Sequence, residues 1–326
     1  MDRVCTRVLW NSNPVAVLAG RSMDWPESTE PLIVAFSAGR ERNGGLLAGH
    51  PVIAENALHW TSRYASLVTT VYGIGAIDGL NERGLAAHGL YLQATDVGQR
   101  DPSKPGLHMG LWVQYLLDQA ADVNAALALM EDIQLVMVSA HGFDATIHLA
   151  LEDAGGDSAI IEFDHGDPVV HHGREFTLMT NDPTYEEQLK LLSLQDFSHP
   201  SRDLPLPGNV NAVDRFQRAA YYSALLPQPD SQRHAVAGVM AVMRNVSVPF
   251  GAPYGEFGVY NTEYRTVADL TNKMYFFELT TSPSTIWVRL DGLDLADGAS
   301  VQVIDPYDET LSGDVTSRLA PREIAF

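Results

Sequence analysis

Strand-forming runs at both ends of the chain, with helical patterns between them, limit the folds that this sequence can adopt. Residues that favour strands are concentrated between turn residues at 4–10, 14–20, 32–36, 65–77, 146–151, 158–163, 177–180, 273–279 and 284–290, and around 266. Apolar residues recur at helical spacing in 107–117, 123–130, 189–194, 213–225 and 233–242. We therefore expect an α+β protein.

Amphipathic helices and half-buried strands must cover each other, so this order predicts two packed sheets covered by helices. The sequence shows no internal repeat and no linker rich enough in Ser, Gly or Pro to divide it. We predict a single domain, although the periodicity fits other α+β arrangements as well.

Charge and composition exclude several classes of function. Asp and Glu number 41 against 21 Lys and Arg, a formal net charge of -20, which would repel a phosphate backbone; we expect no nucleic-acid partner. No apolar run reaches the roughly 18 residues of a membrane span. A single cysteine and the lack of a HExxH pattern predict no metal site and no cofactor.

The N-terminal segment MDRVCTRVLW lacks the apolar core of a secretory signal. The sequence as it stands predicts a cytoplasmic protein. A periplasmic location is the alternative, if a signal peptide has been trimmed from it.

Cys5 is the only cysteine in the chain, and a lone cysteine is more often a small buried apolar residue than a catalyst. The residues expected to lie near Cys5 suggest a catalytic role. Arg21 and Asp24 follow at the end of the second strand, spaced so that a hairpin would return them beside Cys5. Taken singly, Arg21 and Asp24 fit a surface ion pair, Asn181 a turn residue and Arg215 a solvated helix residue.

Taken together, four short motifs resemble a known family. They are Cys-Thr-Arg from residue 5, Arg-Ser-Met-Asp-Trp from 21, Asn-Glu-Arg-Gly-Leu from 81 and Thr-Asn-Asp-Pro-Thr-Tyr from 180, and Asp-Arg-Phe from 214 extends them. This combination resembles the choloylglycine hydrolases, which include penicillin V acylases and conjugated bile salt hydrolases. The resemblance implies the N-terminal nucleophile hydrolase fold, a four-layer αββα sandwich of two antiparallel sheets, and a homotetramer.

The resemblance also implies a mechanism. Removal of residues 1–4 as a leader would leave residues 5–326 as the mature domain, with a free α-amine on Cys5 whose reference pKa is about 7.7 to 8.0. The amine would take the thiol proton, and the thiolate would attack an amide carbonyl to form a thioester. We expect autocatalytic attack of Cys5 on the Val4 carbonyl to remove the leader, unless the true start differs.

By resemblance, each remaining motif residue has a role. Asp24 would orient the α-amine, and Arg21 would favour the thiolate. The Asn181 side chain and the backbone N–H of Tyr91 would stabilise the oxyanion, and Arg215 would complete the site. The expected apolar lining of the acyl pocket is Met23, Trp25, Leu92 and Phe143.

Two departures bear on the substrate. Tyr91 stands where bile salt hydrolases of this family usually carry asparagine, which favours an acylase. The short stretch between 185 and 214 resembles the Gram-negative branch, which is associated with aliphatic and aromatic acyl chains.

We therefore predict an amidohydrolase acting on small-molecule N-acyl amides, with penicillin V and N-acyl homoserine lactones as candidate substrates. The alternatives are a conjugated bile salt hydrolase and, from another class, a non-catalytic protein that uses the pocket to bind acyl ligands.

Overall fold

Two large β-sheets form the centre of the molecule in the computed structural model, which describes residues 4–140, 142–253, 258–259 and 261–326. The seven-stranded sheet has the order β18 (Leu178–Met179), β1 (Val4–Trp10), β2 (Leu18–Trp25), β19 (Asn261–Asp269), β20 (Met274–Leu279), β21 (Ile286–Arg289) and β23 (Gly313–Asp314). The nine-stranded sheet has the order β17 (Asp167–His172), β16 (Ser158–Asp164), β15 (Ile147–Glu152), β10 (Ala86–Tyr91), β9 (Gly75–Asn81), β8 (Ser66–Val71), β3 (Ile33–Phe36), β22 (Gln302–Ile304) and β24 (Ala320–Pro321).

Short strand pairs and five α-helices among the described residues surround the two large sheets. Short strand pairs are β4 (Glu41–Asn43) with β7 (His59–Thr61), β5 (Leu46–Leu47) with β6 (His50–Pro51), β11 (Gly106–His108) with β12 (Gln134–Val136), and β13 (Ser139–Ala140) with β14 (Phe143–Asp144). The α-helices are α1 (Trp112–Gln119), α2 (Val123–Met130), α3 (Tyr185–Leu192), α4 (Ala212–Ala224) and α5 (Gln232–Asn245).

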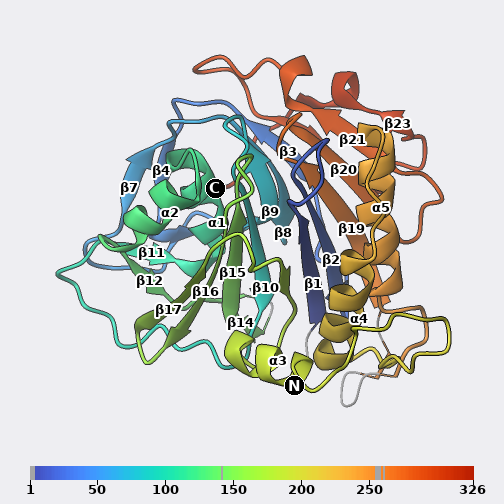
Figure 1. Ribbon diagram of the computed structural model, residues 1–326. Helices are drawn as coiled ribbons and strands as arrows, with labels where there is room; N and C mark the ends of the chain where they lie inside the picture. The colour runs from blue at the N-terminus through green and yellow to red at the C-terminus, as the bar shows by residue number, and fades with distance from the viewer. Residues whose placement is uncertain (1–3, 141, 254–257, 260) are drawn as a thin grey trace.

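Helices cover the outer face of each sheet (Figure 1). Apolar residues of α4 and α5 pack in one core with the seven-stranded sheet and the inner face of the nine-stranded sheet. Apolar residues of α1 and α2 form a second core on the other face of the nine-stranded sheet. The expected four-layer αββα sandwich is confirmed, with strand pairing antiparallel in both large sheets except between β21 and β23.

Side-chain capping begins three of the helices. Asp122, Asn211 and Ser231 each accept a hydrogen bond from a backbone N–H in the first turn of α2, α4 and α5. The helix expected over 123–130 is α2, with the same bounds. The helix expected over 213–225 is α4, confirmed to within one residue at each end, with Asn211 as the cap and Asp214 in the first turn.

Other expected boundaries also shift. The strand expected over 65–77 is two strands, β8 and β9, divided by a turn in which Tyr72 has a positive φ of 51°. The strand expected over 14–20 begins only at Leu18, and the helix expected over 189–194 is α3, which begins at Tyr185. None of the described helices has both the length and the apolar composition needed to cross a membrane.

The α5 helix lies very close to the backbone of β2. A Cβ atom placed on Gly20 would lie 2.6 Å from Val239 Cγ1 and 2.7 Å from Met243 Cγ, so glycine permits this approach. This contact holds the outer helical layer against the strand that continues into Arg21.

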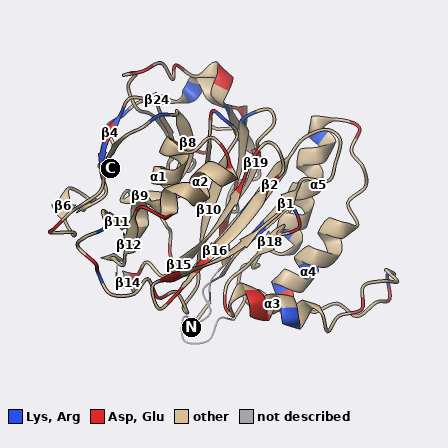
Figure 2. Cartoon of the chain, turned by 60° about the vertical axis from the view of Figure 1, so that its left-hand side comes forward, with Lys and Arg blue, Asp and Glu red and all other residues tan. Residues whose placement is uncertain are grey.

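Charged side chains are scattered over the loops and helix α3, whereas the strands are largely uncharged (Figure 2). Buried charged residues between the sheets are exceptions, and four of them are in direct contact with one another. Glu152 accepts hydrogen bonds from Arg7 and contacts His88 Nε2, and His88 Nδ1 contacts Asp78. The resulting chain links β1 of one sheet to β15, β10 and β9 of the other.

These contacts set the protonation of His88. Burial alone would lower the pKa of His88, but the charges of Glu152 and Asp78 outweigh it and raise that pKa to about 9. Burial likewise opposes ionisation of Asp78, yet the neighbouring imidazolium lowers the pKa of Asp78 to about 2. The network is therefore ionised across the neutral pH range.

The raised pKa of His88 predicts a loss of stability at alkaline pH. Because the folded protein holds this proton up to about pH 9 and the ordinary value is 6.5, the stabilisation is complete below pH 6.5 and is lost as the pH rises through 9. We expect a fall of roughly 3 kcal/mol in the free energy of unfolding, measured by urea denaturation at a series of pH values. In His88→Gln this dependence should flatten; an unchanged slope in that variant would contradict the assignment.

Candidate active site

Pairing between β1 and β2 brings the first two motifs together. In the antiparallel register Cys5 lies opposite Met23, Val4 opposite Asp24, and Arg7 opposite Arg21. The hairpin expected from the spacing is therefore present. Side chains alternate along a strand, so Cys5, Arg21 and Met23 face the second sheet.

Arg21 supplies a buried positive charge beside the sulfur. Its NH2 lies 3.6 Å from Cys5 Sγ and 3.3 Å from the Gly89 carbonyl oxygen, and its NH1 donates to Tyr264 OH at 2.8 Å. Burial raises the pKa of the Cys5 thiol, and the charge of Arg21 is the largest influence in the opposite direction. The thiol is therefore protonated at neutral pH and needs a base in order to react.

Asp24 lies next to the Val4–Cys5 peptide and is held by hydroxyl groups. Thr262 Oγ1 donates to one carboxylate oxygen, and Ser22 Oγ donates to the other at 3.2 Å. Arg215 NH1 lies 3.7 Å from Asp24 Oδ2. Burial raises the pKa of Asp24, with Arg215 as the main opposing charge.

Arg215 reaches the same site from α4. Its guanidinium is completely buried and donates to the carbonyl oxygen of Cys5 at 2.7 Å, to Thr6 Oγ1, and to Asn181 Oδ1 at 3.1 Å. Its Nε donates to the Val210 carbonyl at 2.9 Å. Arg215 therefore fixes the backbone of Cys5 relative to both Asn181 and the helix.

Asn181 connects Cys5 to β10. Its Oδ1 accepts the backbone N–H of Cys5, and its Nδ2 donates to the Tyr91 carbonyl at 2.6 Å. Leu92 N–H donates to the Thr146 carbonyl on the β15 side, so the backbone N–H and C=O of Tyr91 point to the opposite edge of β10. Asn181 thus joins the backbone nitrogen of Cys5 to the Tyr91 carbonyl.

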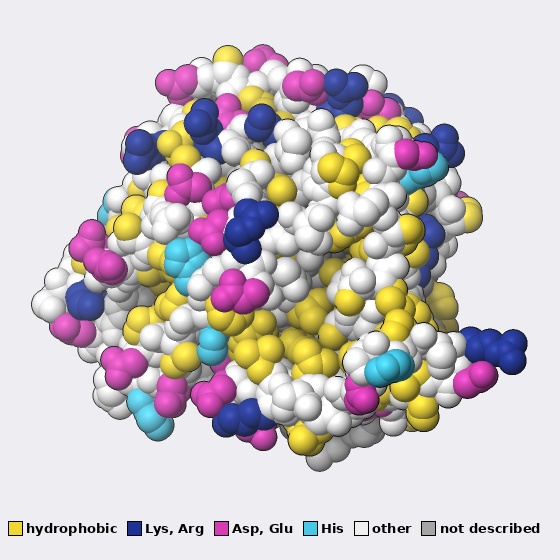
Figure 3. Space-filling model, viewed as in Figure 1, with side chains coloured by type: hydrophobic (Ala, Val, Ile, Leu, Met, Phe, Trp, Pro, Cys, Tyr) yellow, Lys and Arg dark blue, Asp and Glu magenta, His cyan; other side chains and the backbone are white. Residues whose placement is uncertain are grey.

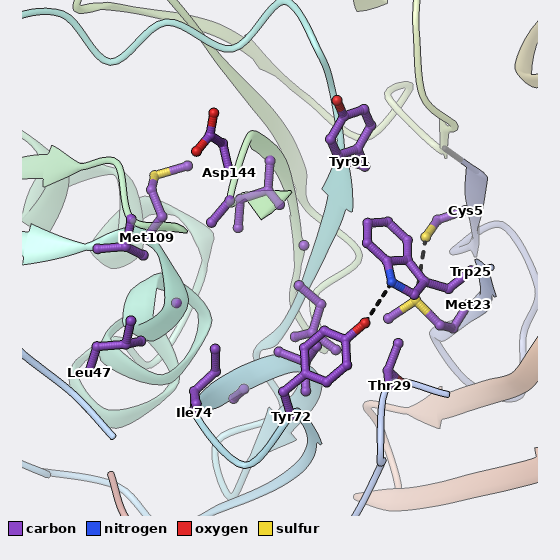
Figure 4. A pocket seen from close by; sticks show the side chains of 18 of the residues that line it. Cys5, Met23, Trp25, Thr29, Leu47, Tyr72, Ile74, Tyr91, Met109 and Asp144 are labelled. Atoms are coloured by element: carbon purple, nitrogen blue, oxygen red, sulfur yellow. Dashed lines mark hydrogen bonds between the residues drawn. The ribbon is translucent and has the colours of Figure 1, made fainter. Parts of the chain in front are cut away.

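A cavity of about 110 Å³ opens beside Cys5 and is lined almost entirely by apolar side chains. Cys5, Met23 and Trp25 lie on one side, and Leu47, Met109 and Asp144 lie across from them (Figure 4). Hydrophobic side chains also gather in a depression on the face seen in Figure 3.

Aromatic contacts shape the wall of the cavity near Cys5. Trp25 Nε1 donates to Tyr72 OH at 2.8 Å, and the rings of Trp25 and Tyr91 meet edge to face with centroids 6.2 Å apart. Met23 and Trp25 line the cavity as expected. Sequence reasoning missed further lining residues, among them Tyr72, Ile74, Met109, Val138, Asp144 and Ile147.

Two expected lining residues have different outcomes. Leu92 is buried but does not line the cavity, because it alternates with Tyr91 along the chain and faces the other way. The side chain of Phe143 lies outside the described part of the structure, although its neighbours Asp144 and Ala145 line the cavity. Among the described residues, no group of three His, Cys, Asp or Glu side chains could hold a metal ion.

The αββα sandwich of two antiparallel sheets is the N-terminal nucleophile hydrolase fold, and the cavity between the sheets ends at a buried cysteine beside Arg21. Residues 5–305 match the family of linear amide C–N hydrolases, choloylglycine hydrolase family. The chain belongs to this family and is a hydrolase acting on carbon–nitrogen bonds of linear amides.

Three similar proteins show which members of this family the chain resembles. A penicillin V acylase from Pectobacterium atrosepticum is 33% identical over 98% of this chain and 90% of its own length. The solved structure of penicillin V acylase from Agrobacterium tumefaciens is 35% identical, with a TM-score of 0.88 and 98% coverage of both chains. A mutant conjugated bile acid hydrolase from Clostridium perfringens shares the fold, with a TM-score of 0.79 at 19% identity, over 94% of this chain and 98% of its own.

The contacts of Arg215 predict a strict requirement for its guanidinium. Arg215→Lys keeps the charge but cannot hold Cys5, Thr6 and Asn181 at once, so we expect a loss of about 2 to 3 kcal/mol in the free energy of unfolding. Denaturant titration measures this loss.

Arg218 provides the matched control on the same helix. Its NH1 bonds only the Pro207 and Asn209 carbonyls, which a lysine ammonium can also reach. Arg218→Lys should therefore lower the free energy of unfolding much less than Arg215→Lys. Equal losses in the two variants would show that Arg215 is an ordinary helix arginine.

Proposed function

We propose that Cys5, freed of residues 1–4, is the nucleophile of an N-acyl amide hydrolase with penicillin V acylase activity. The observation that carries this proposal is the Arg21 guanidinium, 3.6 Å from Cys5 Sγ, at the end of an apolar cavity. The identity to two penicillin V acylases over nearly the whole chain supports the choice of substrate.

The base is the α-amine of Cys5 itself. Burial keeps the thiol protonated at neutral pH, and an α-amine with a reference pKa of about 7.7 to 8.0 is suited to accept its proton. The thiolate attacks the amide carbonyl, and the new ammonium group protonates the departing amine. Water, deprotonated by the same amine, then hydrolyses the thioester.

Oxyanion stabilisation falls to Asn181 and Tyr91. A side-chain amide carries two N–H hydrogens, so the bond from Asn181 Nδ2 to the Tyr91 carbonyl uses only one of them. The Tyr91 backbone N–H is directed to the same edge of β10. Each such donor typically contributes roughly 3 to 4 kcal/mol to lowering the barrier.

Maturation uses the same groups. The Val4–Cys5 peptide lies beside Asp24, while Asn181 and Arg215 hold the nitrogen and carbonyl of Cys5. Attack of Cys5 Sγ on the Val4 carbonyl transfers the leader acyl group from nitrogen to sulfur and leaves the α-amine. Water then hydrolyses this thioester and releases residues 1–4.

Replacement of the nucleophile should abolish hydrolysis. Cys5→Ala removes the thiol and is expected to show no release of phenoxyacetic acid from penicillin V, measured by chromatography, while keeping its fold by circular dichroism. Conjugated bile salts and N-acyl homoserine lactones are tested in parallel. Exclusive turnover of bile salt conjugates would favour the bile salt hydrolase, and tight acyl-ligand binding by Cys5→Ser with no turnover by wild type would favour a binding protein.

Processing is tested by intact mass. The purified wild-type protein is expected to lack residues 1–4, because only then does Cys5 carry an α-amine. Cys5→Ala should keep them if the cleavage is autocatalytic. Wild-type protein that retains the leader and still hydrolyses amides would contradict the proposed base.

A further inference from the structure

The buried charges between the sheets form an alternating series that ends at the proposed nucleophile. Arg7, Glu152, His88 and Asp78 are joined by direct contacts, and Arg21 follows. The series begins at Arg7 on β1, two residues from Cys5, crosses to the nine-stranded sheet and ends at Arg21 on β2, beside the Cys5 sulfur.

His88 is the member that connects two carboxylates. Its Nδ1 contacts Asp78 Oδ1 and its Nε2 contacts Glu152 Oε1, and all three side chains are fully buried. A neutral imidazole has one N–H and could serve only one of these acceptors. The geometry therefore requires the imidazolium, which agrees with the raised pKa of His88.

Asp78 brings this series to Arg21. Its second oxygen, Oδ2, accepts from Thr266 Oγ1 and Tyr275 OH, each at 2.6 Å. Thr266 lies directly opposite Arg21 in the pairing of β19 with β2. The charges of Asp78 and Arg21 act on each other, each favouring the ionised form of the other.

The remaining charges near the site cancel in pairs. Arg7 on β1 is bonded to Glu152 on β15. On the outer face of the seven-stranded sheet, Arg215 lies 3.7 Å from Asp24. The other titratable groups facing this region, Tyr264 on β19 and Tyr275 on β20, have pKa values raised by burial and stay neutral.

We propose that His88 is a positioning residue for the nucleophile: its positive charge neutralises Asp78 and leaves the charge of Arg21 to stabilise the Cys5 thiolate. This inference rests on the proposed role of Cys5. Without the imidazolium, the Asp78 carboxylate would offset Arg21, and the thiolate would lose its counter-charge.

The test is a titration of Cys5 itself. Because the chain has one cysteine, the rate of iodoacetamide alkylation, followed by intact mass across pH, reports only this thiol. In processed His88→Gln, the apparent thiol pKa should rise by about one pH unit relative to processed wild type, as expected for one charge roughly 10 Å away. An unchanged value overturns the proposal.

A second substitution separates charge from packing. Asp78→Asn, added to His88→Gln, removes the carboxylate that the imidazolium had balanced, so the thiol pKa should return towards the wild-type value. A structural role for His88 predicts no such return. A double variant that stays as high as His88→Gln therefore overturns the proposal.

His88→Lys provides a test if His88→Gln does not fold, because it keeps a positive charge between Asp78 and Glu152 while changing the packing. The thiol pKa should then match wild type, and a rise of a full pH unit overturns the proposal. Asp118→Asn is the control, because it disrupts a buried carboxylate bonded to Arg42, Trp60 and Gln114 in the core beneath α1. In Asp118→Asn the pKa of the Cys5 thiol should match wild type. A rise in this variant would show that any loss of a buried carboxylate contact perturbs the thiol, which overturns the specific role of His88.

The titration is independent of turnover. If processed wild type hydrolyses no amide, the proposed function fails whatever the thiol titration shows. If hydrolysis occurs but the pKa of the Cys5 thiol is the same in His88→Gln as in wild type, only the proposed role of His88 is wrong.

Discussion

The buried charge of Arg21 is the constraint on which the arrangement of the two sheets depends. An isolated charge in a protein interior is very costly unless polar groups surround it. Here the hydroxyl of Tyr264 and the carbonyl of Gly89 come from different sheets and both accept from its guanidinium. The charge can be retained only if the sheets keep this spacing, and that spacing also places Cys5 at the cavity.

The same argument explains why polar residues cross the middle of the sandwich. A sheet-on-sheet interface is usually filled with apolar side chains. In this protein the positive side chains of Arg7 and His88 contact the carboxylates of Glu152 and Asp78. Hydroxyl groups complete their hydrogen bonds. Removing a single member leaves a buried charge without its partner, so the network specifies one register of the sheets more strictly than apolar packing alone could.

The sequence predicts those parts of the structure that depend on residues close together in the chain, and it predicts less well those that depend on contacts between distant segments. The β1–β2 hairpin and the helix over 123–130 follow from local pattern, and both were expected. Leu92 was misassigned because cavity lining depends on the direction of strand alternation, which is set by the partner strand. The role of His88 was not foreseen, since a histidine in a strand gives no local sign that carboxylates from Asp78 and Glu152 will enclose it.

The proposed maturation and catalysis would place different demands on one set of contacts. Before cleavage the nitrogen of Cys5 is an amide that donates one hydrogen bond, which Asn181 Oδ1 accepts. After the proposed cleavage the same nitrogen would be an amine with a lone pair and would receive the thiol proton. Arg215 bonds the Cys5 carbonyl and Asn181 in the unprocessed chain through atoms that the cleavage does not alter. The rigid support of the site therefore lies on the carbonyl side of Cys5, which leaves its nitrogen side able to change its chemistry without displacing the sulfur.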